Sequence, residues 1–212
     1  MNYIEIFKKL NYFDLDVKIQ LDKEILVIQG QSGAGKTSIL DCISGISTPD
    51  NGKIILNDKT VYSNDENINL PIRERNVGYV FQSYGLFPHM TVKENVMFGI
   101  KNNKKNRFDA TYGEYMMELM KISHLKNRYP KEISGGEKQR VALARALAIK
   151  PSIMLMDEAF SALDSKTKGV IYKEFLDFKN ICNVSIILVT HDENEAKILG
   201  DRIININNGK MV

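Results

Sequence analysis

The sequence predicts an α/β fold that combines a parallel-sheet core, a small antiparallel β subdomain and an inserted helical subdomain. Strands that helices cover on both faces show short, continuous apolar runs, and the chain has three, at 25–28, 153–156 and 186–189. A glycine-rich turn at 30–35 joins the first run to a helical pattern. From about 83 to 150 the spacing of apolar residues is mainly helical, so this stretch is expected to interrupt the core.

Length and composition favour one large domain with a sizeable core. The chain has 212 residues, of which 43% are apolar. The formal net charge is +3 and basic residues are scattered among acidic ones, so the composition gives no sign of a nucleic-acid partner. Every apolar run is far shorter than the roughly 20 residues that span a bilayer. Cys42 and Cys182 match no metal-ligand spacing and are expected to be buried thiols in a reducing compartment.

The first half of the chain predicts strands around one helix. Loose alternation at 3–7 and 15–21 indicates two strands of the antiparallel subdomain. The stretch 24–29 is a buried strand that runs into the glycine-rich turn, and 37–46 continues as a helix. A turn, a short strand and a further strand are then expected at 47–52, 53–56 and 77–81.

The second half predicts a capped helix and the remaining strands of the core. The helix covers 137–149, and Pro151 ends the helical stretch. Asn208 and Gly209 predict a final hairpin turn. We therefore expect a single domain over 1–212, with its core at about 1–82 and 151–212 and its helical subdomain at about 83–150.

The glycine-rich turn has the composition of a phosphate-binding loop. Its glycines allow successive backbone N–H groups to turn inward, and the following helix adds its positive N-terminus. Lys36 is expected to reach the β- and γ-phosphates of a bound nucleotide, and Thr37 to hold Mg²⁺ through its hydroxyl. The predicted cradle comprises Gly30, Gln31, Ser32, Gly33, Ala34, Gly35, Lys36, Thr37 and Ser38.

A pair of carboxylates ends the apolar run at 153–156. The ligands of an α/β sheet bind at the carboxyl ends of its parallel strands, so this pair is expected beside the phosphate loop. Asp157 is predicted to hold Mg²⁺, largely through water, and Glu158 to act as general base on the attacking water.

Ser134 and Glu137 form the pattern of a capping box at the start of the helix 137–149. Gly135 and Gly136 leave the first N–H groups of this helix bare, so its positive end can face an anion. The same residues also suit an ordinary capped helix.

In this order, the phosphate loop, the capped helix and the acidic strand end resemble the ATP-binding cassette, the motor subunit of ABC transporters. The resemblance covers nearly the whole chain and implies a phosphate-loop NTPase core. It implies that two copies sandwich two ATP molecules, with Ser134, Gly135, Gly136 and Glu137 at the γ-phosphate bound to the other copy. The chain departs from the family at Ala159, where proline is usual, and at Glu137, where glutamine is common.

Further residues resemble single functional positions of the family. Gln82 is similar to the glutamine that contacts Mg²⁺ or water, and His191 to the histidine that orients the γ-phosphate and water. Asp164 lies in a segment that is similar to the loop crossing to the other subunit. Tyr12 or Phe13 could stack on adenine, because stacking asks only for an exposed ring, or both could be core residues.

The resemblance implies a transport function, with integral membrane permease subunits as partners. The segment 83–92 is the expected contact surface for them. A DNA-repair or chromosome-organising ATPase would carry long coiled coils between Lys36 and Ser134. Ser134 lies 98 positions after Lys36 (134 − 36), and the stretch between them shows no heptads. A translation-associated protein would need two cassettes. A nucleotide sensor without turnover would not need Glu158.

Among transporters, 73–78 and 86–92 resemble bacterial importers of oxyanions, metals, polyamines and sugars. The phosphate loop and the short N-terminal hairpin are most similar to molybdate importers. The resemblance implies a peripheral protein at the cytoplasmic face of the membrane that meets a substrate-binding protein indirectly. Because the chain stops at Val212, we expect no C-terminal regulatory domain. Importers of iron, polyamine or sugar, an exporter and a non-transport ATPase are the alternatives.

Overall fold

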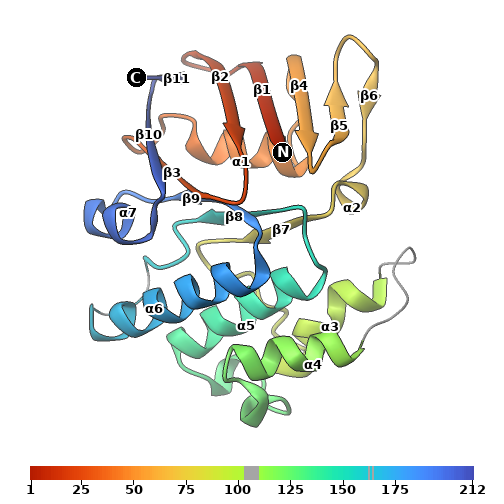
Figure 1. Ribbon diagram of the computed structural model, residues 1–212, viewed down its shortest axis with the longest axis vertical. Helices are drawn as coiled ribbons and strands as arrows, with labels where there is room; N and C mark the ends of the chain where they lie inside the picture. Colours follow the sequence, from red (N-terminus) through yellow and green to blue (C-terminus); the bar gives the residue numbers. More distant parts are fainter. Residues whose placement is uncertain (103–109, 162, 164) are drawn as a thin grey trace.

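The computed structural model describes residues 1–102, 110–161, 163 and 165–212, and it confirms the predicted α/β fold (Figure 1). The described strands form one sheet of 11, in the order β6-β5-β4-β1-β2-β11-β10-β3-β9-β8-β7. The strands are β1 (Asn2–Lys9), β2 (Asp14–Leu21), β3 (Ile25–Gln29), β4 (Asn51–Leu56), β5 (Lys59–Ser63), β6 (Ile68–Asn69), β7 (Val77–Val80), β8 (Ile153–Asp157), β9 (Ser185–Val189), β10 (Arg202–Asn207) and β11 (Lys210–Met211). The α-helices are α1 (Lys36–Ser44), α2 (Ile72–Arg75), α3 (Val92–Asn102), α4 (Ala110–Leu119), α5 (Gly135–Ala148), α6 (Ser165–Cys182) and α7 (Glu193–Leu199).

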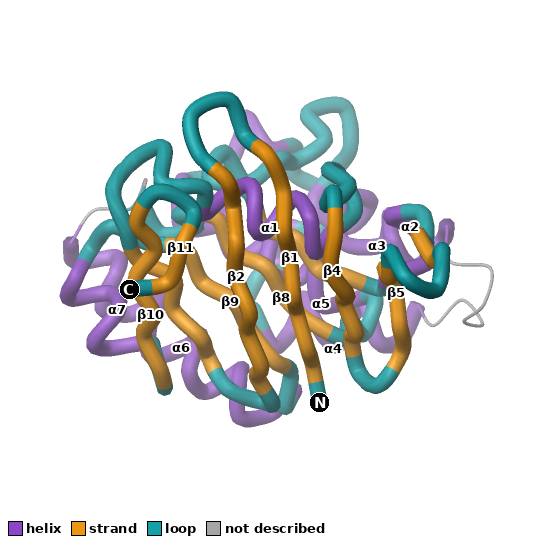
Figure 2. The backbone as a smooth tube through the Cα atoms, turned by 90° about the horizontal axis from the view of Figure 1, so that it is seen from above, coloured by secondary structure: helices purple, strands orange, loops and turns teal. Residues whose placement is uncertain are grey.

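The sheet has an antiparallel half and a parallel half. β6, β5, β4, β1 and β2 pair antiparallel, whereas β10, β3, β9, β8 and β7 pair parallel. The short strand β11 joins the halves, because it pairs with β10 on one side and with β2 on the other (Figure 2). The predicted turn at Asn208 and Gly209 connects β10 to β11, with φ angles of 45° and 79°.

Alternate residues of the parallel strands are buried on opposite faces. Ile153 and Leu155 of β8 join a core with α1 and the antiparallel strands, whereas Met154 and Met156 face α3, α5 and α6. The molecule is therefore layered, with α1 between the two halves of the sheet and the larger helices beyond the parallel strands (Figure 1). The carboxyl ends of β3, β8 and β9 consequently open towards one site.

Several elements differ from the prediction. Strand β4 begins at Asn51, inside the predicted turn, and the structure contains β5, β6, α2, α6 and α7, which were not predicted. Cys42 is buried as expected, and burial raises the pKa of its thiol to about 11. Cys182 is only half-buried, because it ends α6 near the surface.

Arg75 anchors the helix that follows the phosphate loop. Arg75 is 2% exposed, and its guanidinium donates to the carbonyls of Cys42 and Ile43 in the last turn of α1, at 2.8 and 3.1 Å. It also donates to the Leu70 carbonyl and the Asn69 side chain, at 2.9 and 2.8 Å. A cation at a helix C-terminus also complements the helix dipole.

Replacing Arg75 with methionine is expected to lower the free energy of unfolding by about 3 kcal/mol or more, because several buried acceptors lose their donor. Urea denaturation of the purified protein measures this change. Arg73→Met is the matched control, since the Arg73 side chain is 85% exposed. Equal midpoints for the two variants would contradict the assigned role of Arg75.

Candidate functional site

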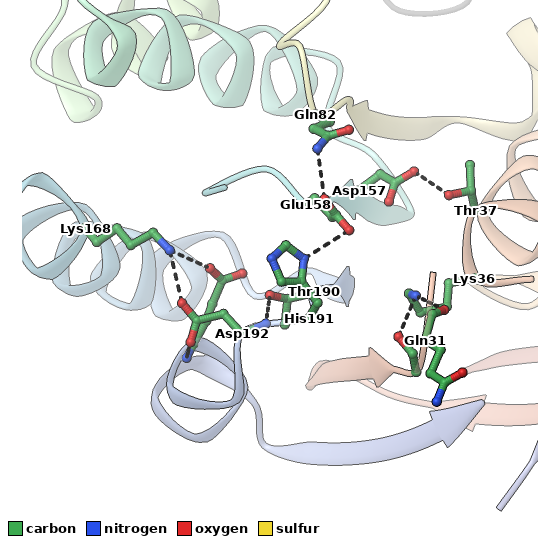
Figure 3. A network of polar contacts seen from close by, with 12 residues as sticks. Gln31, Lys36, Thr37, Gln82, Asp157, Glu158, Lys168, Thr190, His191 and Asp192 are labelled. Carbon is green, nitrogen blue, oxygen red and sulfur yellow. Dashed lines mark hydrogen bonds and ion pairs between the residues drawn. The ribbon is translucent and has the colours of Figure 1, made fainter. Parts of the chain in front are cut away.

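The phosphate loop leads from β3 into α1 and folds around its own lysine. Gly30, Gly33 and Gly35 adopt φ angles of 150°, 79° and 102°, which L side chains rarely adopt. The Lys36 ammonium donates to the carbonyls of Gly30 and Gln31, both at 2.8 Å (Figure 3). Lys36 is 7% exposed, so its charged ammonium lies inside the loop and not in bulk solvent.

A pocket lies over this loop and the end of β8. It brings together predicted residues from segments more than 100 positions apart. Its lining consists of Leu10, Ser32, Gly33, Gly35, Lys36, Thr37, Ser38, Asp157, Glu158 and Val189. The bare N–H groups at the start of α1 and the Lys36 ammonium make this pocket suited to a polyphosphate.

Thr37 and Asp157 supply hard oxygen ligands at the edge of the pocket. The Thr37 hydroxyl donates to Oδ2 of Asp157 at 2.9 Å (Figure 3). Burial raises the pKa of Asp157, and the Thr37 hydrogen bond opposes that shift. Mg²⁺ is usually bound by one or two carboxylates together with water and substrate phosphates, so this hydroxyl–carboxylate pair fits Mg²⁺.

Glu158 lies between the other two predicted catalytic residues. Gln82 Nε2 donates to one carboxylate oxygen of Glu158 at 2.9 Å, and His191 Nδ1 lies 3.2 Å from the other (Figure 3). Gln82 thus contacts Glu158 here rather than the Thr37–Asp157 pair. The backbone of Glu158 has φ of 46°, which is unfavourable for a side-chain-bearing residue, and its N–H donates to the Val189 carbonyl at 2.9 Å.

The segment after Glu158 is anchored although it lacks the family's proline. Ala159 and Phe160 are fully buried. The Phe160 ring packs edge-on against Tyr172 and Phe175, with ring centroids 5.2 and 5.5 Å apart. Aromatic packing therefore stabilises this segment.

The predicted capping box is present at the start of α5. Ser134 N–H donates to the Glu137 carboxylate at 2.7 Å, and Glu137 N–H donates to the Ser134 hydroxyl at 3.3 Å. The Ser134 hydrogen bonds lower the pKa of Glu137. A Cβ at Gly135 would meet no atom within 4 Å, so the helix start is open on that side. None of the residues 134–137, called the signature from here on, is among the described residues that line the pocket.

The two residues predicted to stack on adenine, Tyr12 and Phe13, differ in exposure. Tyr12 is 95% exposed at the tip of the β1–β2 hairpin, which excludes a core role for it. Phe13 is half-buried, and its ring packs closely against Gly35 and Gly209. A Cβ atom added at Gly35 would lie 3.3 Å from this ring, and one added at Gly209 would lie 2.7 Å from it. Stacking of Tyr12 on adenine stays a prediction. Asp164 lies outside the described residues.

Two residues without a predicted role hold the segment 83–92. Arg145 of α5 donates to the carbonyls of Gly85 and Tyr84, at 2.6 and 2.9 Å, and its guanidinium lies 5.4 Å from the centre of the Phe87 ring. Asn95 of α3 is fully buried, and its side chain bonds both backbone groups of Phe87. Sequence spacing gave no signal for either contact, because each joins a helix to an irregular loop.

Comparisons with known proteins match these features. The ABC transporter family model matches residues 13–161. The molybdenum import ATP-binding protein ModC of Haemophilus influenzae is 42% identical over 210 residues, which cover 99% of this chain and 58% of the relative. A sulfate/thiosulfate import ATP-binding protein of Agrobacterium fabrum is 41% identical over 202 residues, which cover 93% of this chain and 57% of the relative. This chain thus spans a little over half the length of each.

A solved structure of similar fold supports the same grouping. It is the dimer of an ATP-binding cassette in a post-hydrolysis state with ADP and phosphate. It matches with a TM-score of 0.79 and 27% identity, and the match covers 100% of this chain and 96% of that chain. Among the described residues, no helix has both the length and the apolar character needed to cross a membrane.

Proposed function

Since the chain belongs to the ABC transporter family, we propose that it is the ATP-hydrolysing motor subunit of an oxyanion importer. One observation carries the catalytic part of this proposal. The carboxylate of Glu158 contacts both Gln82 and His191 and lines the same pocket as the phosphate loop.

The residues of the pocket have distinct roles in ATP hydrolysis. The backbone N–H groups of the phosphate loop and the Lys36 ammonium bind the phosphates of ATP. Thr37 and Asp157 hold Mg²⁺, which neutralises phosphate charge when bound. Glu158 accepts a proton from the attacking water while the oxygen of that water bonds to the γ-phosphorus. The bond between the γ-phosphorus and the oxygen that bridges it to the β-phosphate then breaks, which releases ADP and phosphate. His191 orients the γ-phosphate and the water.

A second copy of the chain completes each site. The open N-terminus of α5 presents Ser134, Gly135 and Gly136 to an anion, yet these residues do not line the pocket of their own subunit among the described residues. In the proposed dimer each signature faces the γ-phosphate on the partner, so ATP draws the two copies together.

Permease subunits are proposed to dock on the segment 83–92, at the cytoplasmic face of the membrane. Arg145 of α5 and Asn95 of α3 fix this segment. A movement of these helices would therefore displace the segment together with a docked partner. A substrate-binding protein would meet the permease and not this chain.

Molybdate, or a related oxyanion such as tungstate or sulfate, is the proposed cargo. The support is the resemblance of the loops and the names of two relatives, one a molybdenum and one a sulfate/thiosulfate import protein. No residue of the pocket is assigned to the cargo. An importer of iron, polyamine or sugar is the alternative within the same mechanism.

Disruption of the gene is expected to impair growth that depends on a molybdenum enzyme, because uptake stops at low molybdate. Excess molybdate restores growth by entering through other routes. Growth on limiting sulfate, measured in parallel, separates the two oxyanions. Normal uptake of both by the disrupted strain, with no redundant importer present, would contradict the cargo and leave the ATPase proposal intact.

A further inference from the structure

Thr190 and Asp192, the two sequence neighbours of His191, fix the loop that carries this histidine. The side chain of His191 is itself 66% exposed. Thr190 is 3% exposed and its hydroxyl accepts from Asp192 N–H at 3.1 Å. The Asp192 carboxylate caps α7 by accepting from the N–H groups of Asn194 and Glu195, at 2.9 and 3.1 Å.

Lys168 of α6 joins this cap from another part of the chain. Its ammonium lies 3.1 Å from Oδ2 of Asp192, the oxygen that the cap leaves free, and 4.0 Å from the Glu195 carboxylate (Figure 3). Glu195 is 2% exposed and accepts from the Tyr172 hydroxyl at 2.9 Å. Because Lys168 and Tyr172 are four positions apart, they lie on the same face of α6.

A mostly buried carboxylate needs such partners. Burial raises the pKa of Glu195, and the Tyr172 and Lys168 contacts oppose that shift. The Lys168 side chain is 20% exposed, so solvent screens its ion pairs less than those of a fully exposed lysine. These contacts hold the first turns of α6 and α7 against each other.

Helix α6 is also tied to the proposed catalytic base. It starts at Ser165, seven positions after Glu158 (165 − 158). Two contacts therefore link these parts of the chain. The side chains of Glu158 and His191 lie 3.2 Å apart, and Lys168 of α6 pairs with Asp192, the residue that follows His191. A shift of α6 would be passed to the backbone of His191.

We propose that Lys168 is a positioning residue, which sets the orientation of His191 through the Asp192 cap and so links α6 to the hydrolytic step. This inference rests on the proposed function, because it assigns a purpose to the His191 side chain. Lys168 is not among the described residues that line the pocket, and it acts on His191 through Asp192.

The test compares three variants of purified protein in MgATP hydrolysis. Lys168→Met removes the charge and keeps the apolar stem, and is expected to lower kcat about tenfold with an unchanged KM for ATP. Lys168→Arg keeps the cation and restores most of the rate. Lys173→Met is the matched control on the exposed side of the same helix and leaves the rate unchanged. A kcat for Lys168→Met within twofold of the unsubstituted protein would overturn the proposal.

A second comparison separates positioning from general destabilisation. In single-turnover measurements, adding Lys168→Met to His191→Ala is expected to cause no further loss, since the lysine acts through the histidine. The same fractional loss in both backgrounds would show that Lys168 acts elsewhere and would overturn the proposal.

A spectroscopic measurement keeps this inference separate from the proposed function. The chain has only three histidines, so the imidazole NMR signals of His89, His124 and His191 can be assigned by single substitutions. Lys168→Met is expected to shift or broaden the His191 signals alone. Unchanged His191 signals would reject the positioning role. If the unsubstituted protein shows no ATP turnover but the His191 signals move, the proposed function fails while the structural link stands.

Discussion

Replacing Glu158 with glutamine is expected to keep MgATP binding and to lower turnover by about 10²- to 10⁴-fold. The substitution preserves the size of the side chain and removes the group that accepts the proton from water. Binding is expected to be unaffected, because the contacts to nucleotide and metal are proposed to come from the phosphate loop and the Thr37–Asp157 pair. Phosphate release and nucleotide titration on the same preparation measure both quantities.

Glu193→Gln is the matched control for this change. Glu193 begins α7, its side chain is 79% exposed, and it pairs with Lys197 at 3.6 Å away from the pocket. Its turnover is expected to equal that of the unsubstituted protein. Steady-state hydrolysis that persists in Glu158→Gln would contradict the role of Glu158 as general base.

Introducing aspartate at Gly135 is expected to abolish the ATP-dependent dimer in the Glu158→Gln background. A carboxylate at the open start of α5 repels the γ-phosphate on the partner and cancels the favourable end of the helix dipole. The fold tolerates the change, because a Cβ at this position would meet no atom within 4 Å. Size-exclusion chromatography with light scattering, with and without ATP, measures the dimer fraction.

Gly135→Asn controls for size without charge and is expected to retain more dimer than Gly135→Asp. ATP affinity of each monomer should stay near normal, since the residues 134–137 do not line its own pocket among the described residues. Equal dimer fractions for Glu158→Gln with and without Gly135→Asp would reject a signature that acts across the dimer.

The parallel core was predictable because its strands are buried on both faces. The runs in β3, β8 and β9 are continuously apolar, and each ends at or next to a residue of the site. The capping box of α5 was equally visible, because Ser134 and Glu137 satisfy each other within one turn. Patterns that depend only on residues close together in the sequence can therefore be predicted from the sequence alone.

The elements that were missed have weaker local patterns. Helix α6 contains Gly169 and exposes Val170 and Ile181 by 56% and 55%, which blurs its apolar stripe. Strand β6 has only two residues, and β5 owes its place to pairing with β4. Tertiary pairing, which a single sequence does not display, decides such segments.

Candidate site residues divide in the same way. The motifs located Lys36, Asp157 and Glu158, and the structure places them around one pocket. The contact between Lys168 and Asp192 joins residues 24 positions apart and depends on how α6 packs against α7. No spacing rule predicts it, and the same holds for the contacts of Arg145 with the segment 83–92.

Two copies of this chain are proposed to hydrolyse MgATP together, and the rate of phosphate release, measured against protein concentration, is the decisive test. The predicted specific activity rises with concentration and then levels off as dimers form, and Glu158→Gln lowers it by about 10²-fold or more at every concentration. A specific activity that is independent of concentration and survives Glu158→Gln would contradict the account.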